Sequence, residues 1–400
     1  MTTVTTKPSK TWTLAPLGDL CQIKGGGTPS RKVAEYYSGS IPWVTVKDFT
    51  APTIHDSQDH ITEKAVTESA TNLIPSGTVL VVTRVGLGKV AITGRDMAVN
   101  QDVKALFPDE RILPEYLFWF LVSKADDIAR MGTGATVKGI TLSQLKGMAI
   151  PVPPVEEQCR IIDILKRADG IRLLRKRAQD TAHQLIPALF IDMFGDPVAN
   201  PNGWMTKPLK EVANIGSGVT KGRKLDGHQT VELPYLAVSN VQDGHLNLTK
   251  VKSIRIKPAE IEKYQVLPGD FLMTEGGDPD KLGRGAIWNG EIDVCLHQNH
   301  VFKVRCNREE FLPEYLRSLV GSHYGKGYFL RVAKQTTGIA SINKTQLSNF
   351  PVLVPPIESQ NEFVARLEGI QSIMGQQEAA QASAESSFQS LLHCAFNGGV

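Results

Sequence analysis

The hydrophobic positions of the chain change their period several times, and each period predicts one kind of element. Short runs that are rich in β-branched residues and bounded by glycine or proline predict strands. They are IPWVTV (41–46), TVLVVTRV (78–85), KVAITG (89–94) and DVKALF (102–107). The segment LPEYLFWFLVSK (113–124) has helical spacing instead, and it predicts a helix. The first 150 or so residues therefore predict a mixed α/β domain.

A long helix is predicted to follow, and it begins at a phrase that occurs twice. Residues 152–165 read VPPVEEQCRIIDIL, and residues 354–367 read VPPIESQNEFVARL. Proline suits the first helical turn because it has no N–H to leave unsatisfied, and the acidic residues after it favour the positive end of the helix dipole. Each phrase therefore predicts a helix start.

Behind each phrase, apolar residues recur at alternating spacings of three and four, which is the a/d spacing of a coiled coil. The first seam is broken by Arg175 and the second by Gln377 and Gln381, and we expect these polar residues to face one another. The first seam comprises Ile161, Ile164, Ala168, Ile171, Arg175, Ala178, Ala182, Leu185 and Leu189. The second comprises Phe363, Leu367, Ile370, Met374, Gln377, Gln381, Ala384, Phe388, Leu391 and Ala395.

The two phrases belong to a longer internal repeat. Trp12 matches Trp204 at an offset of 192 residues (204 − 12), and LPEYL at 113–117 recurs at 312–316. The matches keep their order along the chain, and the offset only grows, to 202 at the paired prolines (355 − 153). This pattern indicates a tandem duplication with short insertions in the second copy.

The repeat predicts an α+β fold with two mixed α/β domains and two long helices. The expected boundaries are 1–153 for the first α/β domain and 154–196 for the first helix, then 197–354 and 355–400 for the second pair. Because each apolar seam is long and narrow, we expect the two helices to pair as an antiparallel coiled coil.

Composition narrows the class of protein. The 400 residues are 41% hydrophobic and 21% charged, as in ordinary soluble proteins, and no apolar run is long enough for a membrane span. Residues 1–14 are predicted to be a polar tail rather than a signal peptide. The five cysteines form no CxxC pair, so the expected location is the reducing cytoplasm. The net charge is only +3, so any nucleic-acid site must rely on local charge.

Motifs for chemistry are missing from the sequence. It contains no GxxxxGK[ST] loop, no complete GxGxxG, no GxSxG and no Asp/Asn-Pro-Pro-aromatic motif. The spacing of Cys295, His297, His300 and Cys306 resembles a zinc site. The corresponding part of the first copy, around Asn100, has neither Cys nor His, so we expect no metal.

Two aligned loops are the best candidates for contact with nucleic acid. Each combines glycine with a hydroxyl group and two cations, which suit phosphate contacts or hydrogen bonds to base edges. GGGTPSRK (25–32) aligns with GSGVTKGRK (216–224), and further cations recur near glycine or before each helix. The candidates are Thr28, Arg31, Lys32, Lys89, Lys138, Thr220, Lys221, Arg223, Lys224, Arg284 and Lys344.

Weaker candidates have equally good structural explanations. Asn100, Gln101, Gln298 and Asn299 are of the types that read adenine, but they also suit the ends of strands. A basic cluster at 166–177 on the first long helix fits a solvated helix face, and it also fits a docking surface for a partner protein.

With its two α/β domains, two VPP-[VI]-E-x-Q helix starts, the TW…PLGDL opening and the LPEYL helix, the chain resembles the specificity subunits of type I restriction–modification systems. The resemblance covers about Trp12 to Asn397. It implies that each α/β domain recognises one half of a split double-stranded DNA target and that the helices act as a spacer. It also implies no catalysis by this chain.

By the same resemblance, the partners are two methyltransferase subunits and the restriction/translocase subunits. S-adenosylmethionine, ATP and Mg²⁺ would belong to those partners, so no cofactor is expected here. Two alternatives remain: a single-chain enzyme that modifies DNA itself, and a purely structural scaffold. The missing motifs disfavour the first alternative, and the paired loops disfavour the second.

Overall fold

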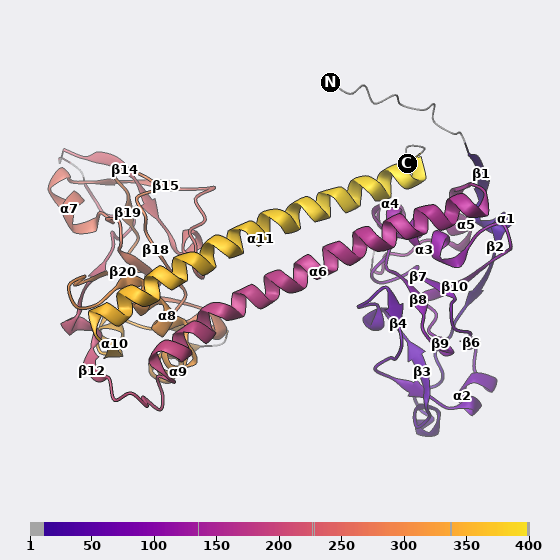
Figure 1. The fold of residues 1–400 in the computed structure, drawn as a ribbon, viewed down its shortest axis with the longest axis horizontal. Coiled ribbons are helices and arrows are strands. Elements are labelled where there is room, and N and C mark those ends of the chain that lie inside the picture. Colours follow the sequence, from indigo (N-terminus) through magenta and orange to yellow (C-terminus); the bar gives the residue numbers. More distant parts are fainter. Residues whose placement is uncertain (1–11, 135, 226, 228, 337, 398–400) are drawn as a thin grey trace. The chain divides into compact units, whose positions relative to one another are not determined.

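The computed structural model describes residues 12–134, 136–225, 227, 229–336 and 338–397. Residues 1–11 of the expected polar tail (1–14) lie outside these residues, and the expectation is wrong for Thr13 and Leu14, which begin a strand. The chain divides into two compact units, residues 1–177 with 379–400, and residues 178–378 (Figure 1). Both long helices, α6 (Val155–Phe194) and α11 (Ile357–Asn397), contribute to both units.

The described part of unit 1 contains three antiparallel or mixed sheets and five short α-helices. The strand orders are β2-β10-β7-β8-β4, β5-β3-β9-β6 and β1-β11. The strands are β1 (Thr13–Pro16), β2 (Cys21–Gly25), β3 (Ile41–Val44), β4 (Thr53–Ile54), β5 (His60–Ile61), β6 (Asn72–Ile74), β7 (Val79–Val82), β8 (Val90–Thr93), β9 (Met97–Val99), β10 (Val103–Pro108) and β11 (Ala149–Val152). The helices are α1 (Leu17–Leu20), α2 (Glu63–Thr67), α3 (Pro114–Ser123), α4 (Ala125–Met131) and α5 (Leu142–Lys146).

Unit 2 has the strand orders β13-β20-β16-β18, β15-β14-β19, β17-β22-β21 and β12-β23. The strands are β12 (Met205–Pro208), β13 (Ala213–Ser217), β14 (Val231–Leu236), β15 (Lys252–Ile256), β16 (Phe271–Thr274), β17 (Gly276–Gly277), β18 (Gly285–Ile287), β19 (Leu296–His297), β20 (Val301–Cys306), β21 (Lys334–Thr336), β22 (Ile339–Ser341) and β23 (Pro351–Val354). The helices are α7 (Ile261–Tyr264), α8 (Pro313–Gly321), α9 (His323–Val332) and α10 (Lys344–Ser348).

The strand registers repeat between the units, as a tandem duplication predicts. Val79 on β7 pairs with Ile92 on β8, and Phe271 on β16 pairs with Ile287 on β18. The edge pairs also correspond, with Thr13 opposite Val152 in β1–β11 and Met205 opposite Val354 in β12–β23. The four strands and the helix predicted from the first copy are confirmed as β3, β7, β8, β10 and α3.

Both long helices are confirmed, and a buried glutamine attaches the start of each one to its α/β domain. Gln158 is fully buried in the first turn of α6. Its side-chain oxygen accepts a hydrogen bond from Leu113 N at 2.9 Å, and its nitrogen donates to Arg111 O at 2.8 Å and Pro153 O at 3.0 Å. Gln360 makes the same three kinds of bond at the start of α11, to Leu312 N, Glu310 O and Pro355 O. These hydrogen bonds explain why both copies of the repeated phrase contain a glutamine at the same place.

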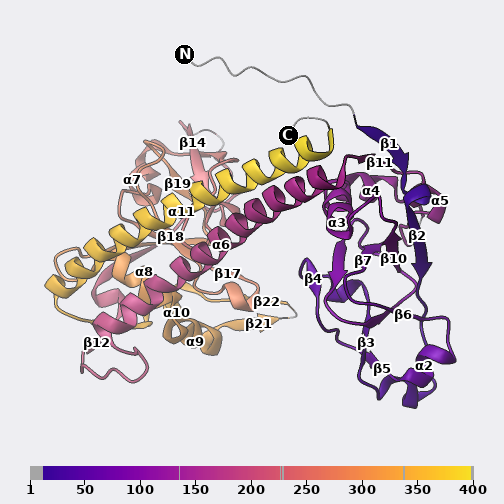
Figure 2. The same ribbon diagram turned by 45° about the vertical axis from the view of Figure 1, so that its right-hand side comes forward.

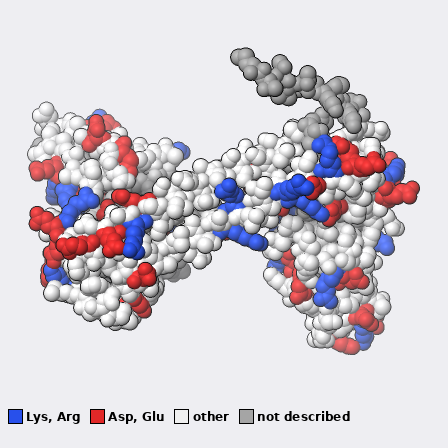
Figure 3. All heavy atoms as spheres, in the orientation of Figure 1, with Lys and Arg blue, Asp and Glu red and all other residues white. Residues whose placement is uncertain are grey.

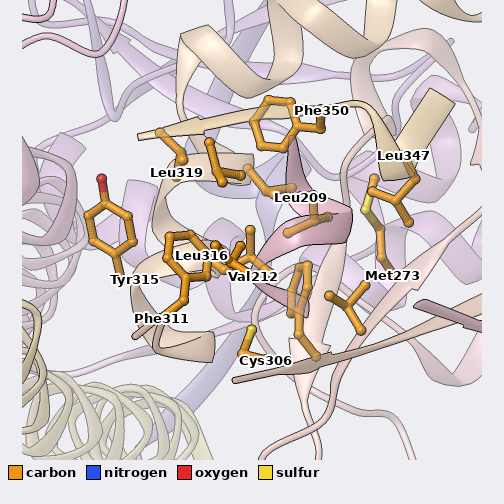
Figure 4. Packing of buried hydrophobic residues seen from close by; sticks show 14 of the residues in the cluster. Leu209, Val212, Met273, Cys306, Phe311, Tyr315, Leu316, Leu319, Leu347 and Phe350 are labelled. Atoms are coloured by element: carbon orange, nitrogen blue, oxygen red, sulfur yellow. The ribbon is translucent and has the colours of Figure 1, made fainter. Parts of the chain in front are cut away.

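The cores of the two units correspond as well. In unit 1, the ring of Phe396 on α11 packs 5.2 Å from that of Tyr116 on α3. In unit 2, Phe194 on α6 packs 4.8 Å from Tyr315 on α8. Figure 4 shows part of the unit 2 core, where Leu316 and Leu319 of α8 lie among residues from several elements. The C-terminal end of α11 therefore packs against α3 in unit 1, and the C-terminal end of α6 packs against α8 in unit 2.

The predicted seam is confirmed for α11 and wrong in part for α6. All expected α11 positions are buried or half-buried. On α6, Ile171 is 56% exposed, Leu185 is 42% exposed and Arg175 is exposed. A straight α-helix drifts relative to a 3.5-residue repeat, so positions chosen by strict a/d spacing rotate out of the interface. Ala182 is confirmed as an inward position, and Arg172, Ile186 and Phe190 lie inward outside the expected seam.

Candidate nucleic-acid interface

The glycines of the two aligned loops are required by close packing within the chain. A Cβ on Gly26 would lie 1.9 Å from Val99 O, and one on Gly218 would lie 2.0 Å from His297 O. Only glycine fits at such an approach. We expected these glycines to let a ligand approach the backbone. At Gly26 and Gly218 the close neighbour is instead the end of β9 or β19.

The loops lie beside two equivalent turns at those strand ends. Gly27 N donates to Val99 O at 3.1 Å, and Val219 N donates to His297 O at 2.8 Å. In the first copy the Thr28 hydroxyl donates to Gln101 Oε1. The structure therefore brings together Thr28 and Gln101, two candidates that lie 73 residues apart in the sequence.

The aligned arginines of the loops are engaged in ion pairs. Arg31 donates to Asp59 at 2.8 Å and lies 4.7 Å from the ring centre of Tyr37. Arg223 donates to both oxygens of Glu260, at 2.8 and 2.7 Å. The hydrogen bond from Arg223 lowers the pKa of Glu260 to about 2. Because each arginine is neutralised by an acid, its net attraction for phosphate is smaller than the sequence suggested.

The lysines of these loops keep more of their charge for a ligand. Lys32 and Lys224 are exposed, as is Thr220. Lys221 lies 5.4 Å from the ring centre of Tyr235 on β14 and is exposed. Lys32 and Lys224 are therefore the stronger candidates for phosphate contact among the cations of the two loops.

Of the remaining candidate pairs, one corresponds in the structure and one does not. Lys89 precedes β8 and Arg284 precedes β18 at equivalent register positions, since Val82 N donates to Lys89 O and Thr274 N donates to Arg284 O. Lys138 and Lys344 are not equivalent. Lys138 lies in the segment before Gly139, whereas Lys344 is the first residue of α10.

The turns after β9 and β19 carry polar groups, and only some of them were recognised as candidates from the sequence. Asn100 is 6% exposed, and its amide bonds Asp102 within the same turn, so it is a structural residue. Arg84 lies 3.6 Å from Asp102. In the second copy His300 corresponds to Asp102, and it lies 2.5 Å from Glu275, which corresponds to Thr83. The sequence could not predict these two pairs, because the pairing of β7 with β10 and of β16 with β20 brings the residues together.

The residues whose spacing resembled a zinc site have other roles and surroundings in the structure. His297 is fully buried, and its Nδ1 lies 2.6 Å from Val301 O. Burial lowers the pKa of His297 to about 4. Burial raises the pKa of both the Cys295 and the Cys306 thiols to about 12, which disfavours the thiolates that zinc needs. Among the described residues, no group of three or more His, Cys, Asp or Glu is placed to hold a metal ion.

Charge is mixed on the face drawn in Figure 3, where Lys and Arg lie among Asp and Glu on both units. A nucleic acid on this face would therefore have to be recognised by particular cations and amides rather than by a field of one sign. No helix among the residues with defined positions is long and apolar enough to cross a membrane.

Comparison with known proteins identifies the family. The sequence profile of the type I restriction modification DNA specificity domain matches residues 9–180 and again 201–381. The chain belongs to this family and carries the domain twice. The double match covers most of the chain and coincides with the internal repeat.

Individual relatives agree with this assignment. The chain is 29% identical over 258 residues to the type I restriction enzyme MjaIX specificity subunit of Methanocaldococcus jannaschii, which is 60% of each chain. It is 40% identical over 162 residues to the EcoR124I/EcoR124II specificity subunit of Escherichia coli, which is 39% of this chain and 40% of the relative. These matches thus span 60% or less of the relatives' length.

Solved structures share the fold over nearly the whole chain. A structure described as showing complex assembly and conformational transition of the type I R-M system gives a TM-score of 0.64 at 20% identity, with 100% of both chains covered. The type I restriction–modification S subunit from M. genitalium gives 0.56 at 14% identity, with 98% of both covered. At these identities the likeness establishes the arrangement of α/β domains and long helices, but not the residues that bind a target.

Proposed function

We propose that this chain is the specificity subunit of a type I restriction–modification system and that it reads a two-part DNA sequence. Its first recognition domain (1–153) reads one half of the target, and its second (197–354) reads the other half. The observation that carries the proposal is the duplicated domain with repeated strand registers, matched twice by the DNA specificity family. A protein with two equivalent reading domains suits a target made of two separate parts.

In this proposal the two long helices, within 154–196 and 355–400, form an antiparallel coiled coil that sets the distance between the halves. Contacts in each unit support the pairing. In unit 1, Arg172 on α6 lies 3.4 Å from Glu385 on α11. In unit 2, the rings of Phe190 on α6 and Phe363 on α11 lie 5.8 Å apart. The residue numbers run in opposite directions between these two contacts, which is the order that an antiparallel pair requires.

The DNA contacts are assigned to the aligned loops and the turns beside them. Thr28 and Gln101 are joined by a hydrogen bond, and Lys32, which follows Thr28 in the same loop, is exposed. The second copy contributes Thr220 and Lys224, which are exposed. Hydroxyl and amide groups read base edges, whereas the lysines contact phosphate.

Catalysis is assigned to partners, because the sequence carries none of the catalytic motifs considered above. The partners are two methyltransferase subunits, which would bind S-adenosylmethionine, and the restriction/translocase subunits, which would use ATP and Mg²⁺. Support comes from the relatives, which are named as specificity subunits of restriction enzymes. The alternative of a single-chain DNA-modifying enzyme has no support from these comparisons.

Three assays with purified protein separate the possibilities. The chain alone is expected to transfer no methyl group to DNA, and adding a cognate methyltransferase subunit is expected to give sequence-specific adenine methylation. DNA binding is measured with and without that subunit. Methylation by the chain alone would support the single-chain enzyme instead. A complex that binds DNA without sequence preference would support the purely structural scaffold.

A further inference from the structure

Val85 adopts a backbone conformation that valine rarely accepts. Its φ is +52°, and the other non-glycine residue with positive φ among the described residues is Asn200. Asparagine tolerates this region, but a β-branched side chain is strained there. Strain of this kind persists where the surrounding structure holds it and often where the side chain has a function.

The valine is also exposed, so packing does not explain it. Val85 is 54% exposed in the loop between β7 and β8. Val85 N donates to Lys138 O at 3.4 Å, which puts it beside the segment that ends at Gly139. Val137 in that segment is 41% exposed. Both valines line an open hollow of about 440 Å³, together with Leu87 and Ala129.

Cations and a polar turn surround this apolar pair. Lys138 lines the same hollow, and Arg84 directly precedes Val85. The side chain of Arg84 is 51% exposed and reaches to 3.6 Å from Asp102, in the turn that holds Gln101. Positive charge beside exposed apolar groups and an amide matches the edge of a DNA groove, where phosphates flank the bases.

The second copy shows that the fold does not need a valine at this place. Arg84 bridges to Gly139, whereas Gly276 pairs with Ser341 and Gly277 pairs with Ala340. Gly277 therefore occupies the position of Val85, and it lies in strand β17 without a positive φ. Ile339 stands at the position of Val137 and is 58% exposed. One apolar residue thus recurs in both copies, and the strained valine is particular to the first.

We propose that Val85 and Val137 contact the 5-methyl group of a thymine in the half-site that the first recognition domain reads. The inference rests on the proposed function and names the base feature that this domain detects. Thymine is the base that presents an apolar methyl group in the major groove, and small apolar side chains are its usual partners. The cations around the pair hold the backbone close enough for that contact.

The test compares thymine with deoxyuridine, which lacks only the methyl group. The two-part target is first mapped with the chain and its methyltransferase subunits. Each thymine of the first half-site, on either strand, is then replaced in turn by deoxyuridine, and the affinity of the whole complex is measured. One replacement is expected to weaken binding by roughly 3- to 10-fold, the size of one buried methyl group.

Val85→Gly supplies the protein side of the comparison. This variant is expected to lose the same 3- to 10-fold on the thymine target and to bind both versions alike. It is also expected to unfold at an equal or higher denaturant concentration, because the strain is removed. Leu14→Ala is the control, since Leu14 is 64% exposed on β1, which pairs with β11 in a sheet separate from that of β7 (Figure 2). It is expected to leave the thymine preference intact.

Several results would overturn the inference. These are a first half-site without an A·T pair, no deoxyuridine effect, or an effect that Val85→Gly leaves unchanged. If Val85→Gly weakened the methyltransferase subunit's binding but not DNA affinity, the pair would be a protein-docking surface, and the inference would be wrong. Failure of the proposed function looks different, because the unmodified complex would then show no preference for any sequence.

Discussion

Arg172 on α6 lies 3.4 Å from Glu385 on α11, measured between Nη1 and Oε2. The same guanidinium group donates to Asp169 at 2.7 Å and lies 5.0 Å from the ring centre of Phe388. Burial acts to lower the pKa of Arg172, but the hydrogen bond to Asp169 and the charge of Glu385 raise it overall. This polar layer lies three residues from Arg175, the polar break of the seam expected from the sequence.

Replacing Arg172 is therefore expected to destabilise unit 1. Arg172→Ala leaves the Asp169 carboxylate, whose side chain is only 11% exposed, without its cation. We expect a loss of about 1–3 kcal/mol in the free energy of unfolding. Arg167→Ala is the matched control, because Arg167 and Asp163 are 76% and 57% exposed, and it should cost at most about 1 kcal/mol. Urea denaturation measures both, and equal losses would contradict the role of the layer.

The buried glutamines are expected to hold each recognition domain on its helix. Gln158→Leu leaves the N–H of Leu113 and the carbonyl of Arg111 without a partner, which costs about 2–3 kcal/mol. In the assembled complex, this variant should weaken recognition of the first half-site more than the second. Gln360→Leu should do the reverse, and the exposed Gln184→Leu should do neither. Affinities for targets mutated in one half at a time report the asymmetry, and a uniform loss would contradict it.

Lys32 is expected to contact a DNA phosphate. Lys32→Ala should weaken binding to all sequences and reduce the slope of log K against log salt by about one. Arg31→Ala should change that slope less, because Asp59 already neutralises Arg31. Lys210, exposed before β13, is the control cation. Measuring DNA affinity from low to high salt tests this prediction. An unchanged slope for Lys32→Ala would show that this lysine does not contact a phosphate.

The buried His297 predicts a particular pH dependence of stability. Burial lowers the pKa of His297 to about 4, below the 6.5 of the exposed side chain. Between these values the unfolded chain binds a proton that the folded chain does not. Stability is therefore lost as the pH falls from about 6.5 to about 4, and it is retained above that window.

NMR titration checks this directly. The ring resonances of His297 should stay those of the neutral form at pH 5. Denaturation of a His297→Gln variant should depend less on pH in the same window. Protonation of His297 at pH 5 would show that the side chain is not enclosed.

Much of the fold was predictable from the sequence because local rules determine it. The VPP phrases locate both long helices, and β-branched runs between glycines locate the central strands. The α6 seam was misjudged because periodicity favours apolar residues, whereas the inward positions include the polar Arg172. The buried role of Gln158 was likewise invisible, since its partners lie at residues 111–113.

The candidate site was less predictable, for the same physical reason. Alignment of the two copies correctly made Lys89 and Arg284 equivalent, but it could not reveal that Asp59 and Glu260 neutralise the two arginines. Those pairs join the loops to segments 28 and 37 residues further along the chain, and the sequence pattern carries no information about such contacts. The strained backbone of Val85 also depends on the loop around it.

The most direct measurement of the account is a genome-wide map of methylated adenines in cells that carry the partner methyltransferase, with and without this chain. The account predicts that methylation appears only with the chain and falls on a sequence of two specific parts separated by a fixed number of unspecified bases. Exchanging residues 12–153 for the corresponding domain of another specificity subunit should change one part and leave the other. Methylation without the chain, or a continuous target that changes throughout after the exchange, would contradict the central claim.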